Sequence, residues 1–127
     1  MKLTSFNPNI VVKDAEPVIA VFEALGFETR HTVRKFENDE ANRLVRMKHP
    51  DGFYVDITET PTVPQTVTEI RMNVDNFEEA YEMLEAKGFR NIRDGQIIET
   101  PSSRMAIMAS PTGFGIDLVK HIKKEER

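Results

Sequence analysis

The chain of 127 residues carries the same pattern twice. Residues 12–27 resemble residues 74–89, 62 positions later, and the two segments end in Leu25-Gly26-Phe27 and Lys87-Gly88-Phe89. Residues 49–57 resemble residues 110–118 at an offset of 61, so one residue has been lost between the matching segments. Self-similarity constrains a fold more than local propensity does. We therefore predict two modules of like structure, whose equivalent positions contribute in pairs to any site.

The length suits one compact domain, because a half of about 60 residues buries too little surface to be stable alone. We expect a single domain over 1–127, with module one at about 1–60, a linker at 61–66 and module two at about 67–127. The linker has the composition Pro61-Thr62-Val63-Pro64-Gln65-Thr66, which is typical of a connection.

The composition excludes several classes of function. The net charge is −4 with both signs interspersed, which argues against binding to nucleic acid or to an anionic membrane. There is no cysteine, so disulfides and thiolate chemistry are unavailable. No apolar stretch approaches the roughly 20 residues that span a bilayer, and the first residues have no signal-peptide pattern. We expect a cytoplasmic protein.

Each half is predicted to fold as one strand, one helix and three further strands. The first helix is expected to start at Asp14 as N-cap, to bury Val18, Val21, Phe22 and Leu25, and to stop at Gly26. The second is expected to start at Asn76, with Glu79 completing a capping box, to bury Phe77, Ala80, Tyr81 and Leu84, and to stop at Gly88. The strands are expected at about 3–12, 28–36, 41–48, 53–59, 67–74, 92–99, 104–109 and 114–121.

Period-2 alternation gives the first and last strands of each module one polar and one apolar face. In the strand after each Pro-x-Gly turn, Tyr54 and Asp56 share a face, and Asp117 lies on the corresponding face of the other module. In the first strands of the modules, Asn7 and Asn9 share a face, as do Glu69 and Arg71. The apolar faces suit a layer of helices, so the polar faces are left to line a ligand site.

The repeated order, with a Val-x-Asp helix entry, a Gly-Phe exit and a Pro-x-Gly turn before the last strand, resembles the vicinal oxygen chelate superfamily. That superfamily contains glyoxalase I, bleomycin resistance proteins and extradiol dioxygenases. The resemblance implies an α+β fold of tandem βαβββ modules, with two curved sheets around a cup and the helices outside. It also implies a homodimer.

In metal-dependent members, the ligands come from the first and last strands of each module and are commonly histidine and glutamate. The resemblance assigns these positions to Asn7, Asp56, Glu69 and Asp117. Here none of them is a histidine. An oxygen-only set of this kind would suit a hard cation such as Mg²⁺ or Mn²⁺. The competing interpretation is that these side chains line a wet cup or pair with Arg46, Arg71 or Arg104.

The histidines and methionines are expected in simpler roles. His49 and His121 are expected at exposed positions, whereas His31 lies in mid-strand and could act as a general base, although a solvated histidine is the more common case. Met47, Met105, Ile107 and Met108 are expected to fill the core and the wall of the cup.

The sequence thus predicts a small-molecule-binding protein of the glyoxalase/bleomycin resistance type without the usual His/Glu metal site. The alternative is a divalent-metal-dependent lyase or isomerase, similar to glyoxalase I, acting on a vicinal-oxygen substrate through an acidic oxygen-ligand site. No cofactor is expected under the first hypothesis, and Mg²⁺ or Mn²⁺ under the second. No catalytic residue is assigned. The residues expected to contact a small-molecule ligand in the cup are Asn9, Tyr54, Asp56, Glu69, Arg71 and Asp117.

Overall fold

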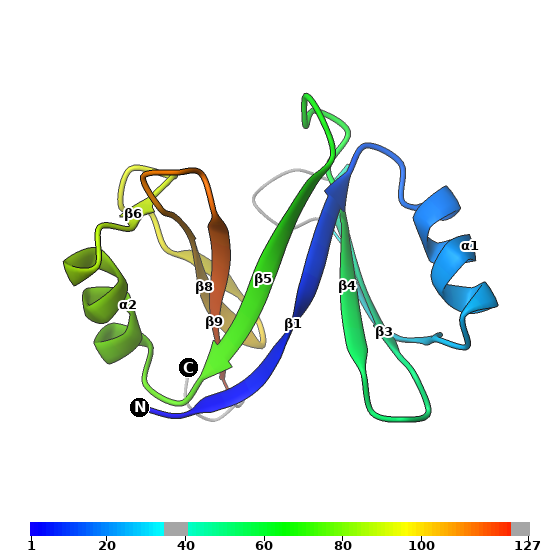
Figure 1. Cartoon of the computed structure of the whole chain (residues 1–127), viewed down its shortest axis with the longest axis horizontal. Helices are drawn as coiled ribbons and strands as arrows, with labels where there is room; N and C mark the ends of the chain where they lie inside the picture. The colour runs from blue at the N-terminus through cyan, green and yellow to red at the C-terminus, as the bar shows by residue number, and fades with distance from the viewer. Residues whose placement is uncertain (35–40, 123–127) are drawn as a thin grey trace. The chain divides into compact units, whose positions relative to one another are not determined.

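The computed structural model describes residues 1–34 and 41–122. Two compact units are formed, and we call Asn7–Thr68 the first unit, and Met1–Phe6 with the chain from Glu69 onward the second unit. Whether they make one domain stays a prediction. The elements in chain order are β1 (Leu3–Val12), α1 (Glu16–Ala24), β2 (Glu28–Arg34), β3 (Arg43–Lys48), β4 (Tyr54–Glu59), β5 (Val67–Val74), α2 (Phe77–Ala86), β6 (Arg90–Asn91), β7 (Ile98–Thr100), β8 (Ser103–Ala109) and β9 (Gly115–His121) (Figure 1).

In the first unit the strands lie in the order β2-β3-β4-β1. The two hairpin pairs β2–β3 and β3–β4 are antiparallel, whereas β1 and β4 are parallel, with Asn9 opposite Asp56. One face of these strands packs against α1. The core of this unit is made of Val12, Ala15, Ile19, Val45, Met47, Val55 and Ile57.

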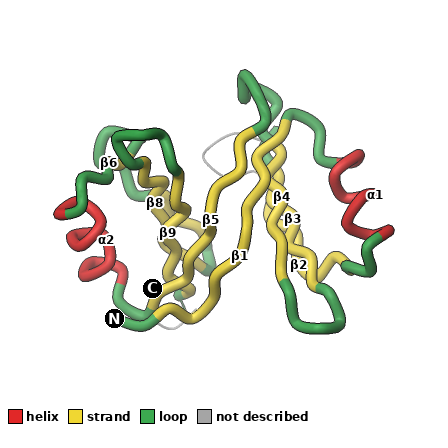
Figure 2. Tube along the Cα trace, in the orientation of Figure 1, coloured by secondary structure: helices red, strands yellow, loops and turns green. Residues whose placement is uncertain are grey.

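In the second unit the order is β5-β9-β8-β6, and β7 also pairs with β8. β5 and β9 are parallel, with Arg71 opposite Asp117, and β8 and β9 are antiparallel. Helix α2 covers the apolar face of these strands, as the tube view of this unit also shows (Figure 2). The core here is made of Val74, Phe77, Ala80, Leu84, Ala106, Met108, Ile116 and Leu118.

The first residues of the chain are fixed to the start of α2. The amide of Lys2 donates to Asp75 Oδ1 at 2.7 Å, and the amide of Asp75 donates back to the Lys2 carbonyl at 3.1 Å. The bond from the Lys2 amide favours the ionised carboxylate and lowers the pKa of Asp75 below its ordinary value. β1 therefore begins in one unit and ends in the other.

The start of α2 was predicted correctly, and the start of α1 was not. Asn76 is the N-cap of α2, and its Oδ1 accepts the Glu79 amide at 3.1 Å. The N-cap of α1 is Ala15, not Asp14, and its own amide donates to Glu59 Oε2 at 2.7 Å. Asp14 Oδ1 accepts the Glu16 amide at 3.2 Å instead. A carboxylate from β4 thus supplies a contact that local sequence could not reveal.

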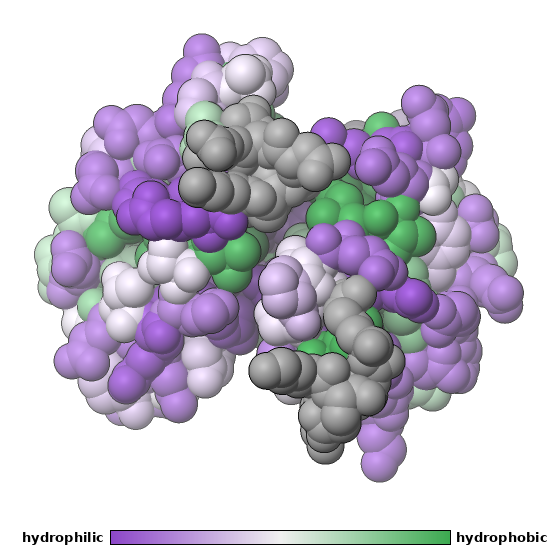
Figure 3. All heavy atoms as spheres, turned by 180° about the vertical axis from the view of Figure 1, so that it is seen from behind, coloured by the Kyte–Doolittle hydropathy of each residue, from purple (hydrophilic) through white to green (hydrophobic). Residues whose placement is uncertain are grey.

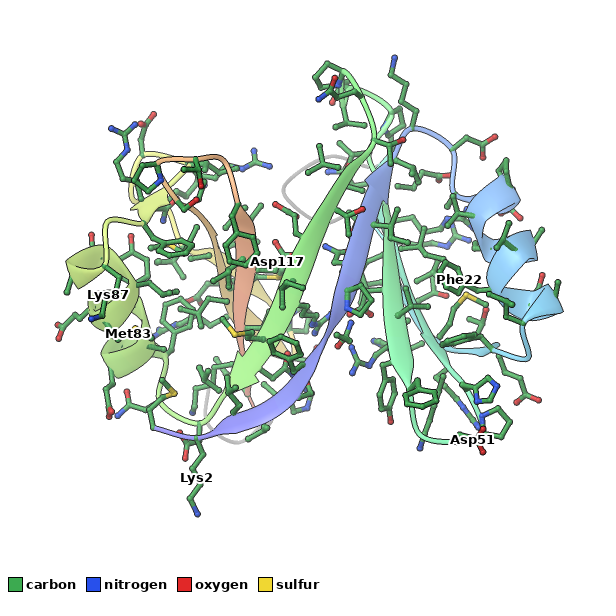
Figure 4. The ribbon with its side chains drawn as sticks, in the orientation of Figure 1. Lys2, Phe22, Asp51, Met83, Lys87 and Asp117 are labelled. Carbon is green, nitrogen blue, oxygen red and sulfur yellow. The ribbon has the colours of Figure 1, made fainter. Side chains whose placement is uncertain are left out.

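The buried face of α1 also differs from the prediction. Val18 and Phe22 pack on the core as expected, and Phe22 lies on the strand side of the helix (Figure 4). Val21 and Leu25 are instead 56% and 59% exposed, and Ile19 is buried in their place. Ala15 lies one turn before Ile19. The apolar stripe of α1 that packs on the core therefore consists of residues 15, 18, 19 and 22. On the face seen in the space-filling view, hydrophobic residues lie among hydrophilic ones (Figure 3).

The strand predicted at 92–99 is replaced by two short strands, β6 and β7. Between them the chain turns at Asp94 and Gly95, which both have positive φ, of 54° and 84°. The glycine tolerates this conformation without strain, and aspartate is among the residues that adopt it most often. The other predicted strands are found with shifts of one or two residues at their ends, and residues 35–36 of the second predicted strand lie outside the described residues.

Neither helix in the described parts of the chain is long and apolar enough to cross a membrane.

The corrected face of α1 predicts the effect of two truncations. Ile19→Ala should lower the free energy of unfolding by about 2–4 kcal/mol, because it leaves a cavity in the core of the first unit. Leu25→Ala, the matched control in the last turn, should change it by less than about 0.5 kcal/mol, because this side chain is mostly exposed. Urea denaturation of both variants measures the difference. A larger loss for Leu25→Ala would mean that the helix packs on its predicted face.

Candidate functional site

The face of the first unit that α1 does not cover carries a set of polar side chains, which we call the first polar row. In β4, Val55 and Ile57 belong to the core, so Tyr54, Asp56 and Thr58 point the other way. Adjacent strands place side chains of the same face opposite Asp56: Asn9 on β1 and Arg46 on β3. The row consists of Asn7, Asn9, Arg46, Tyr54, Asp56 and Thr58.

Asp56 lies at the centre of this row and is fully buried, with 0% of its surface exposed. Its Oδ2 accepts a hydrogen bond from Arg46 at 2.9 Å and another from Asn7 Nδ2 at 2.7 Å. Arg46 also approaches Asn7 Oδ1 at 3.4 Å. A carboxylate removed from water is costly unless it is paired, and Arg46 supplies the compensating charge.

The rest of the first polar row is held in place by similar contacts. Thr58 Oγ1 donates to Asn9 Oδ1 at 2.8 Å, and this hydrogen bond is buried. The guanidinium carbon of Arg46 lies 4.2 Å from the centre of the Tyr54 ring, and Lys48 Nζ lies 5.3 Å from it. These are cation–π distances. The tyrosine therefore shields the Arg46–Asp56 pair on one side.

The second unit has a corresponding face, which we call the second polar row: Glu69, Arg71 and Asn73 of β5, and Asp117 of β9. Asp117 is labelled in Figure 4. Arg71 Nε donates to Asn73 Oδ1 at 3.2 Å, and Asp117 lies opposite Arg71 in the strand register. Asp117 is buried, with 4% of its surface exposed. The other face of β9 contributes Ile116 and Leu118 to the core. The alternation predicted from sequence is found in β4, β5 and β9.

Glu69 lies against β9 because position 115 is a glycine. A Cβ built on Gly115 would lie only 2.9 Å from Glu69 Oε2 and 3.1 Å from its Cγ. The repeat places Tyr54 at the equivalent position of the first unit. The first polar row therefore carries a large aromatic ring at a position where the second unit has no side chain. The two rows differ in surface shape as a result.

The two aspartates each have an arginine directly opposite them, but on different strands. In the first unit Asp56 lies between Asn9 on β1 and Arg46 on β3. In the second unit Asp117 lies between Arg71 on β5 and Ile107 on β8.

Residues that are equivalent in the repeat have equivalent strand partners: Asn9 corresponds to Arg71, and Arg46 to Ile107. The buried aspartate is on the last strand in both units. The arginine opposite it is on the neighbouring strand β3 in the first unit and on the neighbouring strand β5 in the second.

The four residues assigned to a metal by the resemblance do not all fall in one unit. Asn7 and Asp56 lie in the first unit, and Glu69 and Asp117 in the second. In the first unit the amide nitrogen of Asn7 donates to Asp56 Oδ2, and Arg46 approaches Asn7 Oδ1 and Asp56 Oδ2. Whether these residues bind a metal stays a prediction. Within the described ranges, no three side chains of His, Cys, Asp or Glu gather in a way that could hold a metal ion.

The arginines and histidines singled out in the sequence differ in their contacts and exposure. Arg46 does pair with a carboxylate of the row, whereas Arg104 does not: it binds Glu78 at 2.7 Å and Glu99 at 3.1 Å on the surface. His31 lies opposite Arg46 in the register of β2 and β3 and is exposed. His121 is exposed as expected.

His49 was expected at an exposed position and is half-buried instead. Its ring lies between Phe27 and Phe53, with centroid distances of 5.3 Å and 5.9 Å. Its Nδ1 accepts the amide of Asp51 at 3.0 Å. These contacts give the residue a structural role in the turn before β4.

Arg46 is the member of the row that sequence reasoning left undecided. Its strand alternates poorly, since Leu44, Val45 and Met47 are all buried, so the pattern of β3 does not show which way Arg46 points. The repeat offset aligns Arg46 with Ile107, and each of these residues is the strand partner of an aspartate, Asp56 or Asp117. This alignment is a weak signal that Arg46 lies beside Asp56. The role of the six predicted ligand-contacting residues stays a prediction.

No family model matches the chain, and the search of curated proteins found no match. Solved structures do match. Methylmalonyl-CoA epimerase from Mycobacterium tuberculosis is 16% identical, with 98% of this chain and 92% of that chain covered and a TM-score of 0.74. A glyoxalase/bleomycin resistance protein/dioxygenase superfamily member from Vibrio splendidus is 16% identical, with 94% and 99% covered and a TM-score of 0.61.

Glyoxalase I from Zea mays matches over 94% of this chain and 43% of that chain, at 15% identity and a TM-score of 0.65. Identities this low establish the fold alone. The chain has the fold of the glyoxalase/bleomycin resistance/dioxygenase superfamily, as the resemblance implied, and the predicted fold class is confirmed. Because one fold hosts many functions, what the site does depends on its own residues.

The buried pair in the first polar row predicts a large effect of removing its cation. Arg46→Ile, which introduces the residue found at the equivalent position 107, should lower the free energy of unfolding by about 3 kcal/mol. The loss arises because Asp56 stays buried without a compensating charge. Adding Asp56→Asn should recover part of it. Chemical denaturation measures both.

The matched control is Arg30→Ile on β2, whose ion pair with Glu28 is long, at 3.8 Å, and exposed. It should change the stability by no more than about 1 kcal/mol. If Arg46→Ile and Arg30→Ile had equal effects, the pair with Asp56 would not be a stabilising element.

Proposed function

We propose that this chain binds a small organic molecule through residues of its polar rows, and that it does so without a bound metal. The support from the fold is that structural neighbours are named for activities on small molecules, as an epimerase of methylmalonyl-CoA and as glyoxalase I. The support from the chain itself is the gathering of polar side chains on the strand faces that the helices leave uncovered.

The observation that carries the metal-independent part is the Arg46–Asp56 pair. A guanidinium 2.9 Å from the buried carboxylate already supplies the positive charge that a metal would bring. A second cation there would repel Arg46 in a medium where charges interact strongly. In the second unit, Arg71 is the strand partner of Asp117.

The polar rows also suit recognition of a ligand with several oxygens. Arg71 presents a planar fork that matches a carboxylate or phosphate, and Asn73 fixes its orientation through Nε. Tyr54 offers a flat ring with a polar tip, which suits stacking and hydrogen bonding. The remaining contacts expected for the ligand come from Asn9, Asp56, Glu69 and Asp117.

Metal analysis tests the proposal against the lyase or isomerase alternative. The purified protein should contain no stoichiometric metal, and Mn²⁺, Mg²⁺, Ni²⁺ and Zn²⁺ should leave its thermal midpoint unchanged, because Arg46 balances Asp56. A tightly held metal that is lost on Asp56→Ala or Glu69→Ala would overturn the proposal and favour an acidic oxygen-ligand site.

Ligand binding is tested with a thermal-shift panel of small carboxylates, hydroxy acids and acyl-CoA thioesters, methylmalonyl-CoA among them. At least one compound should stabilise the protein, and Arg71→Gln should abolish that stabilisation. Arg93→Gln, which removes the same charge from a turn outside both rows, should preserve it. A panel without any stabilising compound, or equal losses in both variants, would count against the rows as the binding site.

The resemblance also implies a homodimer, which stays a prediction. Light scattering at micromolar concentration should give a mass of about twice 14.6 kDa. A mass equal to that of one chain would refute the dimer.

A further inference from the structure

The second unit contains a surface pocket that neither polar row uses. It has a volume of about 430 Å³ and is lined by the segment that follows α2 and by the turn that joins β8 to β9. Figure 1 shows these two backbone segments. Its lining residues are Gly88, Arg90, Asn91, Ile92, Ala109, Ser110 and Pro111. Pockets that hold small ligands range from about 300 to 1,000 Å³, so this one has room for a compact organic molecule.

Two polar residues of the pocket wall are fixed by their own hydrogen bonds. Asn91 Nδ2 donates to Tyr81 Oη at 3.2 Å and to the Gln96 carbonyl at 3.0 Å, and its Oδ1 accepts the Arg93 amide at 2.8 Å. Ser110 Oγ accepts the Phe114 amide at 3.0 Å and lies 3.0 Å from Thr112 Oγ1. The wall is therefore preformed, which lowers the cost of binding.

Arg90 is in a different situation from those two residues. Within residues 1–34 and 41–122 it forms no ion pair and no side-chain hydrogen bond. Its fork of N–H groups is thus available at the pocket, beside the apolar surfaces of Ile92, Ala109 and Pro111. A cation next to an apolar wall suits a ligand with an anionic group and an apolar body.

The repeat shows how the second unit came to have this space. The equivalents of Gly88, Ser110 and Phe114 in the first unit are Gly26, His49 and Phe53. There the His49 ring lies between Phe27 and Phe53, and its Nε2 is 3.2 Å from the Cβ position of Gly26.

In the second unit a serine replaces the histidine. The equivalent rings of Phe89 and Phe114 contact each other directly, with centroids 6.0 Å apart. The imidazole that fills the turn in one unit is therefore missing in the other.

We propose that this pocket is a second binding site, specific for a small organic carboxylate with an apolar or aromatic body. Arg90 binds the carboxylate through charge-assisted hydrogen bonds, and Ile92, Ala109 and Pro111 contact the body of the ligand. None of Glu69, Arg71 and Asp117 lines the pocket, so the site is independent of the function proposed above.

Amide chemical shifts of the ¹⁵N-labelled full chain test this site, with phenylacetate as the probe and the uncharged phenylacetamide as its isostere. Phenylacetate should cause saturable shifts at Gly88, Asn91, Ile92 and Ser110. Phenylacetamide should bind the unchanged protein about tenfold more weakly than phenylacetate does. Phenylacetate should bind the Arg90→Gln variant about tenfold more weakly than the unchanged protein. Each change removes a charge-assisted hydrogen bond. Ser110→His, which restores the histidine of the first unit, should abolish the shifts by filling the space.

A control variant distinguishes binding at this pocket from a general attraction of the anion to positive charge. Arg93→Gln removes a nearby positive charge that does not line the pocket. It should leave the shifts that phenylacetate causes at the pocket unchanged. The proposal is overturned if no resonance shifts, if the shifts fall elsewhere, if the acid and the amide bind equally, or if Arg90→Gln behaves like Arg93→Gln. Failure of the polar rows to bind any ligand would leave this outcome unaffected.

Discussion

The packing of one helix against one face of its strands is the constraint on which each unit depends. Val55 and Ile57 in the first unit, and Ile116 and Leu118 in the second, pack in the cores under α1 and α2. Because side chains alternate along a strand, burying these residues forces Asp56 and Asp117 onto the opposite face. The polar rows are therefore a direct consequence of the helix packing.

Burying a carboxylate removes its hydration and raises the free energy of the folded state unless a positive charge lies nearby. The two units place that charge on different strands. Arg46 pairs with Asp56 from β3, whereas the arginine opposite Asp117 is Arg71 on β5. The residues that changed between the repeats are those around the aspartates: Asn9 corresponds to Arg71, Arg46 to Ile107, and Tyr54 to Gly115. Such divergence gives the two rows different shapes and charges while the backbone pairing stays the same.

The same principle accounts for the pocket of the second unit. Gly26 and Gly88 follow equivalent helices, α1 and α2, and both have positive φ. What differs is the side chain beside them: the Cβ position of Gly26 faces the His49 ring and that of Gly88 faces the Pro111 ring, while a serine stands where the first unit has His49. Similar turns can thus support aromatic packing in one unit and an open pocket that carries a cation in the other.

The sequence by itself determined the two-module fold, the second helix cap and the facing of β4, β5 and β9, because these follow from periodicity and from local hydrogen bonding. It predicted the wrong face of α1, since Val21 and Leu25 continue an apolar stripe that the strands do not reach. It also predicted one strand where a turn at Asp94 and Gly95 leaves two. Only the tertiary structure decided that Arg46 pairs with Asp56 and that Glu59 accepts the Ala15 amide. Those contacts join residues distant in sequence, and their energies depend on burial and on neighbouring strands, which no local pattern encodes.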